Sequence, residues 1–381
     1  MTMASLTFRN GRIFDGVDLH ETQAAHFENG RFAGLVPEAD MPSAEQEIDL
    51  GGDILFPGFV DLQVNGGDGV LFNSDPSVAT LRRMAAAHRR LGVTAFLPTL
   101  ITDTRDKTRA AVNATQEAIR MGVTGIAGLH LEGPHLSIAR KGAHDATLIR
   151  AMEAEDLDIL LKAATALPRL KVTVAPENVT EAQVTALAET GVLVSLGHSD
   201  ADNATSARYI AAGARCVTHL FNAMSQLGNR EPGLVGAALS NGNVHAGLIA
   251  DAVHVHPDTI RAAWKAKTGP GQIFLVSDAM AVAGTDATEF ELGDRLIRRN
   301  AGVLTLADGT LAGADLDLST AVRVMVEKVG VDLASALRAA TSIPAALVGL
   351  DYRFDEISNV VRLTRGHTGG TYIVRDAVIA S

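Results

Sequence analysis

The sequence has one cysteine, one tryptophan and few aromatic residues, and acidic side chains outnumber basic ones. A single cysteine, Cys216, cannot form an internal disulfide, and residues 1–13 lack the apolar centre of a signal peptide. No uninterrupted apolar run approaches the roughly 18 to 20 residues that a membrane helix needs. A formal net charge of −11 disfavours nonspecific binding to nucleic acid or anionic membranes. We therefore predict a cytoplasmic protein without a nucleic-acid or membrane partner.

The length and the local patterns predict one large and one small domain. A chain of 381 residues, 47% of them hydrophobic, can bury a large core. In the first fifty residues, short alternating runs are separated by Asn10-Gly11 and Asn29-Gly30, which are strong hairpin signals. Near the other end, residues 371–374 indicate a strand that returns to this meander. We expect a small β-sandwich domain from residues 1–54 plus 355–381, and a large domain from residues 55–354.

The large domain repeats a unit of apolar strand, polar loop and alanine-rich helix. Such alternation over this length predicts an α/β fold, a (β/α)8 TIM barrel. A doubly wound open sheet is the rival interpretation, but the glycine-rich run Asn65 to Gly69 lacks the glycine order of a dinucleotide-binding loop. The eight expected strands begin near Phe59, Val93, Ile126, Val172, Val192, Arg215, Val244 and Ile273, and helices are expected at 77–91, 105–121, 180–190 and 202–212.

Metal-type ligands follow three of these strands, and a carboxylate follows a fourth. Glu132 comes directly after one apolar run, and His198 and His219 follow two others. In a barrel the carboxyl ends of all strands meet at one mouth, so we expect these side chains to converge. One carboxylate and two imidazoles suit a divalent cation, and three protein ligands leave a position for water. Asp278, after the last strand, could take a proton from that water, which predicts a metal-assisted hydrolase.

Several motifs together resemble the N-acetylglucosamine-6-phosphate deacetylases of the amidohydrolase superfamily. Pro-Gly-Phe-Val-Asp at 57–61 fits many amidohydrolases. The resemblance to the deacetylase branch rests on Leu-Glu-Gly-Pro at 131–134, Thr-His-Leu-Phe-Asn-Ala-Met at 218–224 and Arg-Glu-Pro-Gly at 230–233. It implies hydrolysis of the N-acetyl group of N-acetylglucosamine 6-phosphate to glucosamine 6-phosphate and acetate.

The resemblance also implies roles for single residues. Glu132, His198 and His219 would hold the metal, Asp278 would act first as base and then as acid, and His144 would stabilise charge on the carbonyl oxygen. Many amidohydrolases carry His-x-His where this chain has Gln63 and Asn65. Neutral amides are poor ligands for a transition metal, so we expect one divalent ion per subunit, with zinc as the expected metal.

The same resemblance implies a phosphosugar pocket and a homodimer in which the neighbouring subunit supplies some phosphate contacts. The phosphate would bind the backbone amides of Asn222 and Ala223, the side chain of His254 and the planar guanidinium of Arg230. The full set of expected substrate-binding residues is Gln63, Asn65, Ala143, His144, Asn222, Ala223, Arg230, His254, Leu311, Ala312 and Gly313.

Two alternatives stay open at this point. An amidohydrolase could act on N-acetylgalactosamine 6-phosphate or on an unphosphorylated N-acyl compound. A phosphosugar sensor on the same barrel is disfavoured, because a sensor has no need of a general base such as Asp278. His130, close to Glu132, is expected to support the site or the core rather than to bind the metal.

Overall fold

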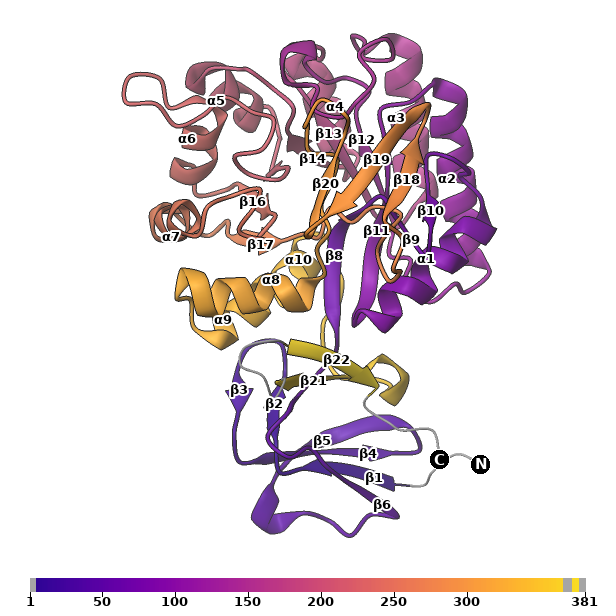
Figure 1. The fold of residues 1–381 in the computed structure, drawn as a ribbon, viewed down its shortest axis with the longest axis vertical. Coiled ribbons are helices and arrows are strands. Elements are labelled where there is room, and N and C mark those ends of the chain that lie inside the picture. Colours follow the sequence, from indigo (N-terminus) through magenta and orange to yellow (C-terminus); the bar gives the residue numbers. More distant parts are fainter. Residues whose placement is uncertain (1–4, 366–371, 377–381) are drawn as a thin grey trace.

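The computed structural model describes residues 5–365 and 372–376, and its central element is a barrel of eight parallel strands (Figure 1). The strands follow the order of the chain, and each pairs in parallel with the next. This confirms the predicted (β/α)8 fold. The strands are β8 Phe59–Val64, β11 Val93–Ile101, β12 Leu129–Glu132, β13 Leu170–Val174, β14 Leu193–Leu196, β15 Cys216–Val217, β16 His245–Leu248 and β17 Ile273–Leu275.

Helices connect the strands and cover the outside of the barrel (Figure 1). Side-chain caps mark where several begin: the Ser77 hydroxyl accepts from the Thr80 N–H at 3.2 Å, and Thr104 accepts from Lys107 at 3.3 Å. The four predicted helices occur as α1, α2, α4 and α5. The bounds are α1 Val78–Arg90, α2 Arg105–Arg120, α3 Ala154–Ala166, α4 Glu181–Glu189, α5 Asn203–Ala211, α6 Gly233–Ser240, α7 Pro257–Ala266, α8 Leu318–Val324, α9 Leu333–Ala339 and α10 Ser342–Leu347.

The barrel closes between β8 and β17, the two ends of the strand order, partly through one side chain. The Asp61 carboxylate accepts from the Ser277 N–H at 3.2 and 3.3 Å and from the Gln63 N–H at 3.1 Å. Close by, the Asp278 N–H donates to the Gln63 carbonyl at 3.1 Å. Asp61 is fully buried. It therefore ties the first strand to the segment that carries Asp278.

Strands from both ends of the chain build a small β-sandwich beside α8, α9 and α10 (Figure 1). Its core includes Leu6, Phe8, Phe27 and Phe354. The predicted sandwich from both termini is thus confirmed, and we propose domain boundaries near residues 54 and 355; residues 1–4, 366–371 and 377–381 of the predicted domain lie outside the described residues. One sheet contains β5 Arg31–Pro37, β4 Gln23–Glu28, β1 Ser5–Arg9 and β6 Gln46–Asp49, and the other β22 Tyr372–Asp376, β21 Val361–Arg365, β7 Ile54–Phe56, β2 Arg12–Phe14 and β3 Leu19–His20.

A three-stranded antiparallel meander follows the last barrel strand and lies against the barrel (Figure 1). It consists of β18 Glu289–Leu292, β19 Arg295–Asn300 and β20 Val303–Thr305. Its apolar side chains pack with Met280 and Val282, just beyond Asp278. The Arg295 guanidinium donates to the Ala143 carbonyl at 2.7 Å. The meander therefore supports the loop that carries His144. The glycine-rich run after β8 forms the short hairpin β9 Gly66–Gly67 and β10 Val70–Leu71.

Asp61 should make stability depend on pH in a defined direction. Burial raises the pKa of Asp61 from 3.8 to about 7, although hydrogen bonds from Ser277 and Gln63 oppose the rise. The folded state therefore binds this proton more tightly than the unfolded state. Its contribution to stability is present below about pH 4 and is lost as the pH rises to about 7, by up to ~4 kcal/mol.

Asp61→Asn cannot titrate, so it isolates this effect. In metal-free protein, we expect the free energy of unfolding of the wild type minus that of Asp61→Asn to decrease between about pH 4 and about pH 8. Urea denaturation at a series of pH values measures the difference. A difference that is independent of pH would contradict the assignment.

Candidate active site

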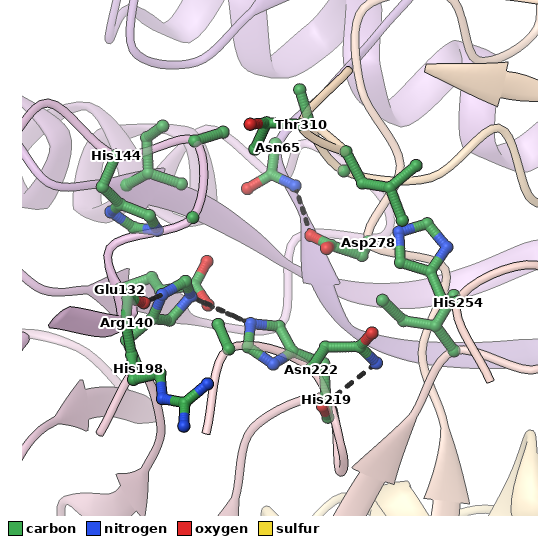
Figure 2. A pocket seen from close by; sticks show the side chains of 18 of the residues that line it. Asn65, Glu132, Arg140, His144, His198, His219, Asn222, His254, Asp278 and Thr310 are labelled. Carbon is green, nitrogen blue, oxygen red and sulfur yellow. Dashed lines mark hydrogen bonds and ion pairs between the residues drawn. The ribbon is translucent and has the colours of Figure 1, made fainter. Parts of the chain in front are cut away.

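Glu132, His198 and His219 come together at the carboxyl ends of β12, β14 and β15 (Figure 2). The Nε2 atoms of His219 and His198 lie 3.1 and 3.4 Å from Oε1 of Glu132, and 3.0 Å from each other. All three side chains are buried. Within residues 5–365 and 372–376, this is the cluster of His, Cys, Asp or Glu with metal-ligand spacing.

The three side chains fit a divalent cation. Ligands about 2.0 to 2.1 Å from a tetrahedral ion lie roughly 3.3 Å apart, close to the spacing seen here. The Nδ1 atom of His198 lies 2.8 Å from the carbonyl oxygen of Arg140. An Nδ1–H that donates to this carbonyl leaves the Nε2 lone pair free toward the cluster. Two imidazoles that converge on one buried carboxylate are thus a donor set for a metal such as zinc.

The backbone bends sharply at three residues of the site. His198, His219 and Asp278 have φ of 48°, 32° and 50°, in the left-handed region that non-glycine residues seldom occupy. Each of them follows a barrel strand, so the bend turns the side chain at the mouth of the barrel. Such conformations cost of order 1–3 kcal/mol each and cluster at functional sites.

Asp278 faces the metal-type cluster and is held by two amides. The Asn65 Nδ2 donates to Oδ1 of Asp278 at 2.7 Å (Figure 2). The Gln63 Nε2 donates to the same oxygen at 3.1 Å. Gln63 Nε2 also lies 3.2 and 3.3 Å from the two oxygens of Glu132. The two residues that replace His-x-His therefore turn their N–H groups toward carboxylates. In this arrangement they organise the site as donors.

Burial and neighbouring groups shift the pKa values of these side chains in opposite directions. Burial would raise the pKa of Glu132, but hydrogen bonds with His198 and His219 outweigh it and hold the pKa well below its ordinary value. Burial raises the pKa of Asp278, and the negative charge of Glu132 adds to the rise. Burial holds the pKa of His144 well below its ordinary value. The site thus combines a carboxylate that stays charged, a carboxylate with raised proton affinity and a neutral imidazole.

A cavity of about 370 Å³ opens above the cluster. It is lined by most of the residues that the sequence predicted for the site, which come from six of the eight strand ends and from the loop after β20. Gln63 does not line the cavity because it is covered between Glu132 and Asp278. The predicted residues that line it are Asn65, Glu132, Ala143, His144, His198, His219, Asn222, Ala223, His254, Asp278, Leu311, Ala312 and Gly313.

Sequence reasoning missed Arg140 and Asp251. Arg140 lines the cavity (Figure 2). Its side chain forms an ion pair with Asp200 at 2.7 Å, and its backbone carbonyl accepts the hydrogen bond from His198. The Asp251 carboxylate lies 2.6 Å from Nδ1 of His254 and also accepts from two backbone N–H groups. It therefore fixes the ring of His254. The Asp-x-x-His spacing was the available signal, but only the turn at Ala252, with φ of 63°, brings the pair into contact.

Arg230 lies outside the cavity. It is exposed, on the loop between β15 and α6. The loop is anchored beside it, because the Glu231 carboxylate accepts from the backbone N–H groups of Asn203 and Gly233 at 2.7 and 2.9 Å. Arg230 is thus an exposed residue that does not line the cavity of its own chain.

The sequence matches a known family over most of its length. The model described as "Amidohydrolase family" covers residues 54–358. The chain belongs to the amidohydrolase family. As an amidohydrolase it is a hydrolase that acts on an amide, as predicted. Metal dependence is general in this family, and the Glu132, His198 and His219 cluster could hold the ion.

Relatives and solved structures agree with this assignment. The amidohydrolase is 42% identical to the N-acetylgalactosamine-6-phosphate deacetylase of Shewanella sp. (strain ANA-3), over 87% of this chain and 84% of that protein. It is 35% identical to the N-acetylglucosamine-6-phosphate deacetylase of Haemophilus influenzae, over 85% and 84%. The crystal structure of N-acetylglucosamine-6-phosphate deacetylase from Pasteurella multocida superposes with a TM-score of 0.89, at 34% identity and 97% coverage of both chains. In the part of the amidohydrolase that the structure describes, no helix combines the length and the apolar character needed to cross a membrane.

Replacing the carboxylate ligand should abolish tight metal binding. Glu132→Gln keeps the shape of the side chain but substitutes a neutral amide, which is a poor ligand. We expect the metal affinity to fall by more than about 100-fold, beyond the usual loss from a supporting partner. Competition with a chromophoric chelator measures the affinity. Glu117→Gln on the surface of α2 is the matched control, and a Glu132→Gln protein that retains stoichiometric metal would refute the ligand assignment.

Proposed function

We propose that this amidohydrolase removes the N-acetyl group of N-acetylglucosamine 6-phosphate and releases glucosamine 6-phosphate and acetate. The observation that carries the proposal is the arrangement of Asp278 opposite Glu132, His198 and His219 in a cavity that Asn222 and His254 also line. Relatives whose names specify 6-phosphate deacetylases, at 35 to 42% identity over more than four fifths of the chain, support it.

The metal is proposed to be a single zinc ion per chain, held by Glu132, His198 and His219. A divalent cation bound there supplies positive charge that polarises the amide carbonyl and lowers the pKa of water. Gln63 and Asn65 support the proposal of one ion, because their N–H groups already serve Glu132 and Asp278. Two tightly bound ions per chain in active protein would contradict it.

Asp278 moves the proton in this mechanism. Its carboxylate takes a proton from the attacking water as the oxygen adds to the acetyl carbon, and later gives that proton to the departing nitrogen. An amine leaves poorly as an anion, so protonation is essential for cleavage. The raised proton affinity of Asp278 suits both steps, because the group must accept a proton readily and release it again. Hydrogen bonds from Asn65 and Gln63 orient the oxygen that carries out this transfer.

His144 is proposed to stabilise the carbonyl oxygen as negative charge develops. Its Nδ1 lies 2.7 Å from the Thr102 hydroxyl. A hydroxyl that donates to Nδ1 leaves the imidazole proton on Nε2, where the ring can donate to an oxygen in the cavity. The bond from Arg295 to the Ala143 carbonyl holds the preceding residue in place.

The phosphate is proposed to bind the backbone amides of Asn222 and Ala223 together with His254. Leu311, Ala312 and Gly313 would shape the sugar pocket. Arg230 would complete the phosphate site of a second copy, so that a homodimer forms composite active sites. The exposed position of Arg230, away from the cavity of its own chain, supports this assignment. The cytoplasm is the proposed compartment.

The identity of the sugar is the finer question. N-acetylgalactosamine 6-phosphate is the second candidate, because the relative from Shewanella, which is more similar to this chain than the relative from Haemophilus, carries that name. The two sugars differ only in the orientation of one hydroxyl group.

Acetate release tests the proposed reaction. Purified protein should release acetate from N-acetylglucosamine 6-phosphate, and a chelator should abolish release. N-acetylglucosamine without phosphate should react at least about 30-fold less efficiently, since a lost charged contact costs ~2 to 5 kcal/mol. Faster release from N-acetylgalactosamine 6-phosphate would identify that sugar as the substrate instead. Release from neither phosphosugar by protein with verified metal would refute both candidates.

Mixed dimers test the position of Arg230. Asp278→Asn and Arg230→Ala should each be nearly inactive alone. When mixed, a heterodimer combines the intact Asp278 of one chain with the intact Arg230 of the other at one of its two sites. Random reassembly would then restore about one quarter of wild-type activity in the acetate assay, given the statistics of isologous pairing. No recovery in dimers shown to exchange subunits would place Arg230 in the site of its own chain.

A further inference from the structure

A continuous chain of buried polar side chains crosses the inside of the barrel beneath the metal-type cluster. His130 on β12 is its centre: Nδ1 lies 3.1 Å from the Thr99 hydroxyl, and Nε2 lies 2.8 Å from the Thr173 hydroxyl. The Thr218 hydroxyl lies 2.7 Å from those of both Thr173 and Ser195. We call these five side chains the hydroxyl layer; each is fully buried.

The hydrogen bonds of the hydroxyl layer can all be satisfied at once. A neutral imidazole offers one N–H and one lone pair. If the Nδ1–H donates to Thr99, the Thr173 hydroxyl donates to Nε2, and Thr218 and Ser195 donate in turn along the chain. Thr99 in turn accepts from the backbone N–H of Val64 at 3.0 Å. A fully satisfied buried network specifies one arrangement, whereas a broken one leaves costly unpaired groups.

Three members of the layer are close in sequence to a metal-type ligand. Thr218 directly precedes His219, His130 lies two residues before Glu132, and Ser195 lies three residues before His198. Thr99 binds the backbone of Val64, which lies between Gln63 and Asn65. The layer therefore connects the strands of all three metal-type ligands and of both amides that hold Asp278.

The layer joins two strands that are not neighbours at β15, which has only two residues. Thr218 and His219 lie just beyond its end, where the Thr218 N–H still donates to the Leu196 carbonyl of β14 at 2.9 Å. There the bond from Thr218 to Thr173 reaches β13, which is not a neighbour of β15 in the sheet. This side-chain bond thus adds a link to β13 to the backbone hydrogen bonds that tie the segment to β14 and β16.

We propose that the hydroxyl layer positions Glu132, His198 and His219 for metal binding, with Thr173 as its central link. Its members do not line the cavity; His130, Ser195 and Thr218 act through the ligands that follow them in the chain, and Thr173 acts through its bonds to His130 and Thr218. The proposal concerns metal affinity, so it does not depend on which sugar is hydrolysed.

Thr173→Val tests the proposal, because valine keeps the shape of threonine and removes the hydroxyl. The variant leaves both His130 and Thr218 without this partner. We expect zinc affinity, from chelator competition on the full-length protein, to fall about 10- to 100-fold, as for other groups that orient ligands. Thr173→Ser, which restores the hydroxyl, should recover most of the affinity.

Thr115→Val is the matched control. Thr115 is a fully buried threonine in α2, and its hydroxyl has no hydrogen-bond partner in the described residues. The same change there should leave zinc affinity within about 2-fold of the wild type, which separates loss of the layer from a general effect of burying valine.

Two outcomes would overturn the proposal. One is a folded Thr173→Val protein whose zinc affinity matches that of the wild type. The other is equal loss of affinity in Thr173→Ser, which would show that the hydroxyl is not the cause. If Thr173→Val does not fold, Ser195→Ala at the end of the chain serves instead, with an expected loss of about 3- to 10-fold; an unchanged affinity in that variant would also reject the proposal.

Discussion

The structure depends on a concentration of buried charge at the mouth of the barrel. The Glu132 carboxylate has almost no exposed surface, and the Asp278 carboxylate, also buried, shares the Gln63 side chain with it. Two carboxylates this close repel each other and lose their hydration. His198 and His219 converge on Glu132 with their Nε2 atoms, an arrangement that a divalent cation would stabilise and that no apolar core would select.

The barrel makes this concentration of charge possible. Its strands fix the position of each side chain from below, and the loops that follow can take strained conformations without loss of the fold. The left-handed backbone at His198, His219 and Asp278 is an example, because each bend lies two or three residues beyond the end of a barrel strand. Asp61 contributes at the seam between β8 and β17, where its carboxylate replaces a backbone acceptor.

The supporting groups lie at two levels of the barrel. At the level of the cavity, Asp251 fixes His254, and Arg295 fixes the loop before His144. One layer lower, His130 connects the neighbouring strands β11, β12 and β13, and the bond between Thr173 and Thr218 joins β13 to β15, which are not neighbours in the sheet. Loss of a partner that orients a metal ligand commonly lowers metal affinity about 10- to 100-fold. In the proposed arrangement, the geometry of the site thus depends also on residues that do not line the cavity.

The sequence by itself determined the fold class, the metal-type ligands and the expected base, because strand periodicity and the residue after each strand are local properties. It also assigned Gln63 and Asn65 to the site from their place in a motif. Only the tertiary structure decided that these amides face Glu132 and Asp278, that Asp251 holds His254, and that His130 joins strands far apart in the chain. It also placed Arg230 outside the cavity of its own chain. These relations depend on distances between strands and on the direction of bends after them, which spacing along a sequence does not encode.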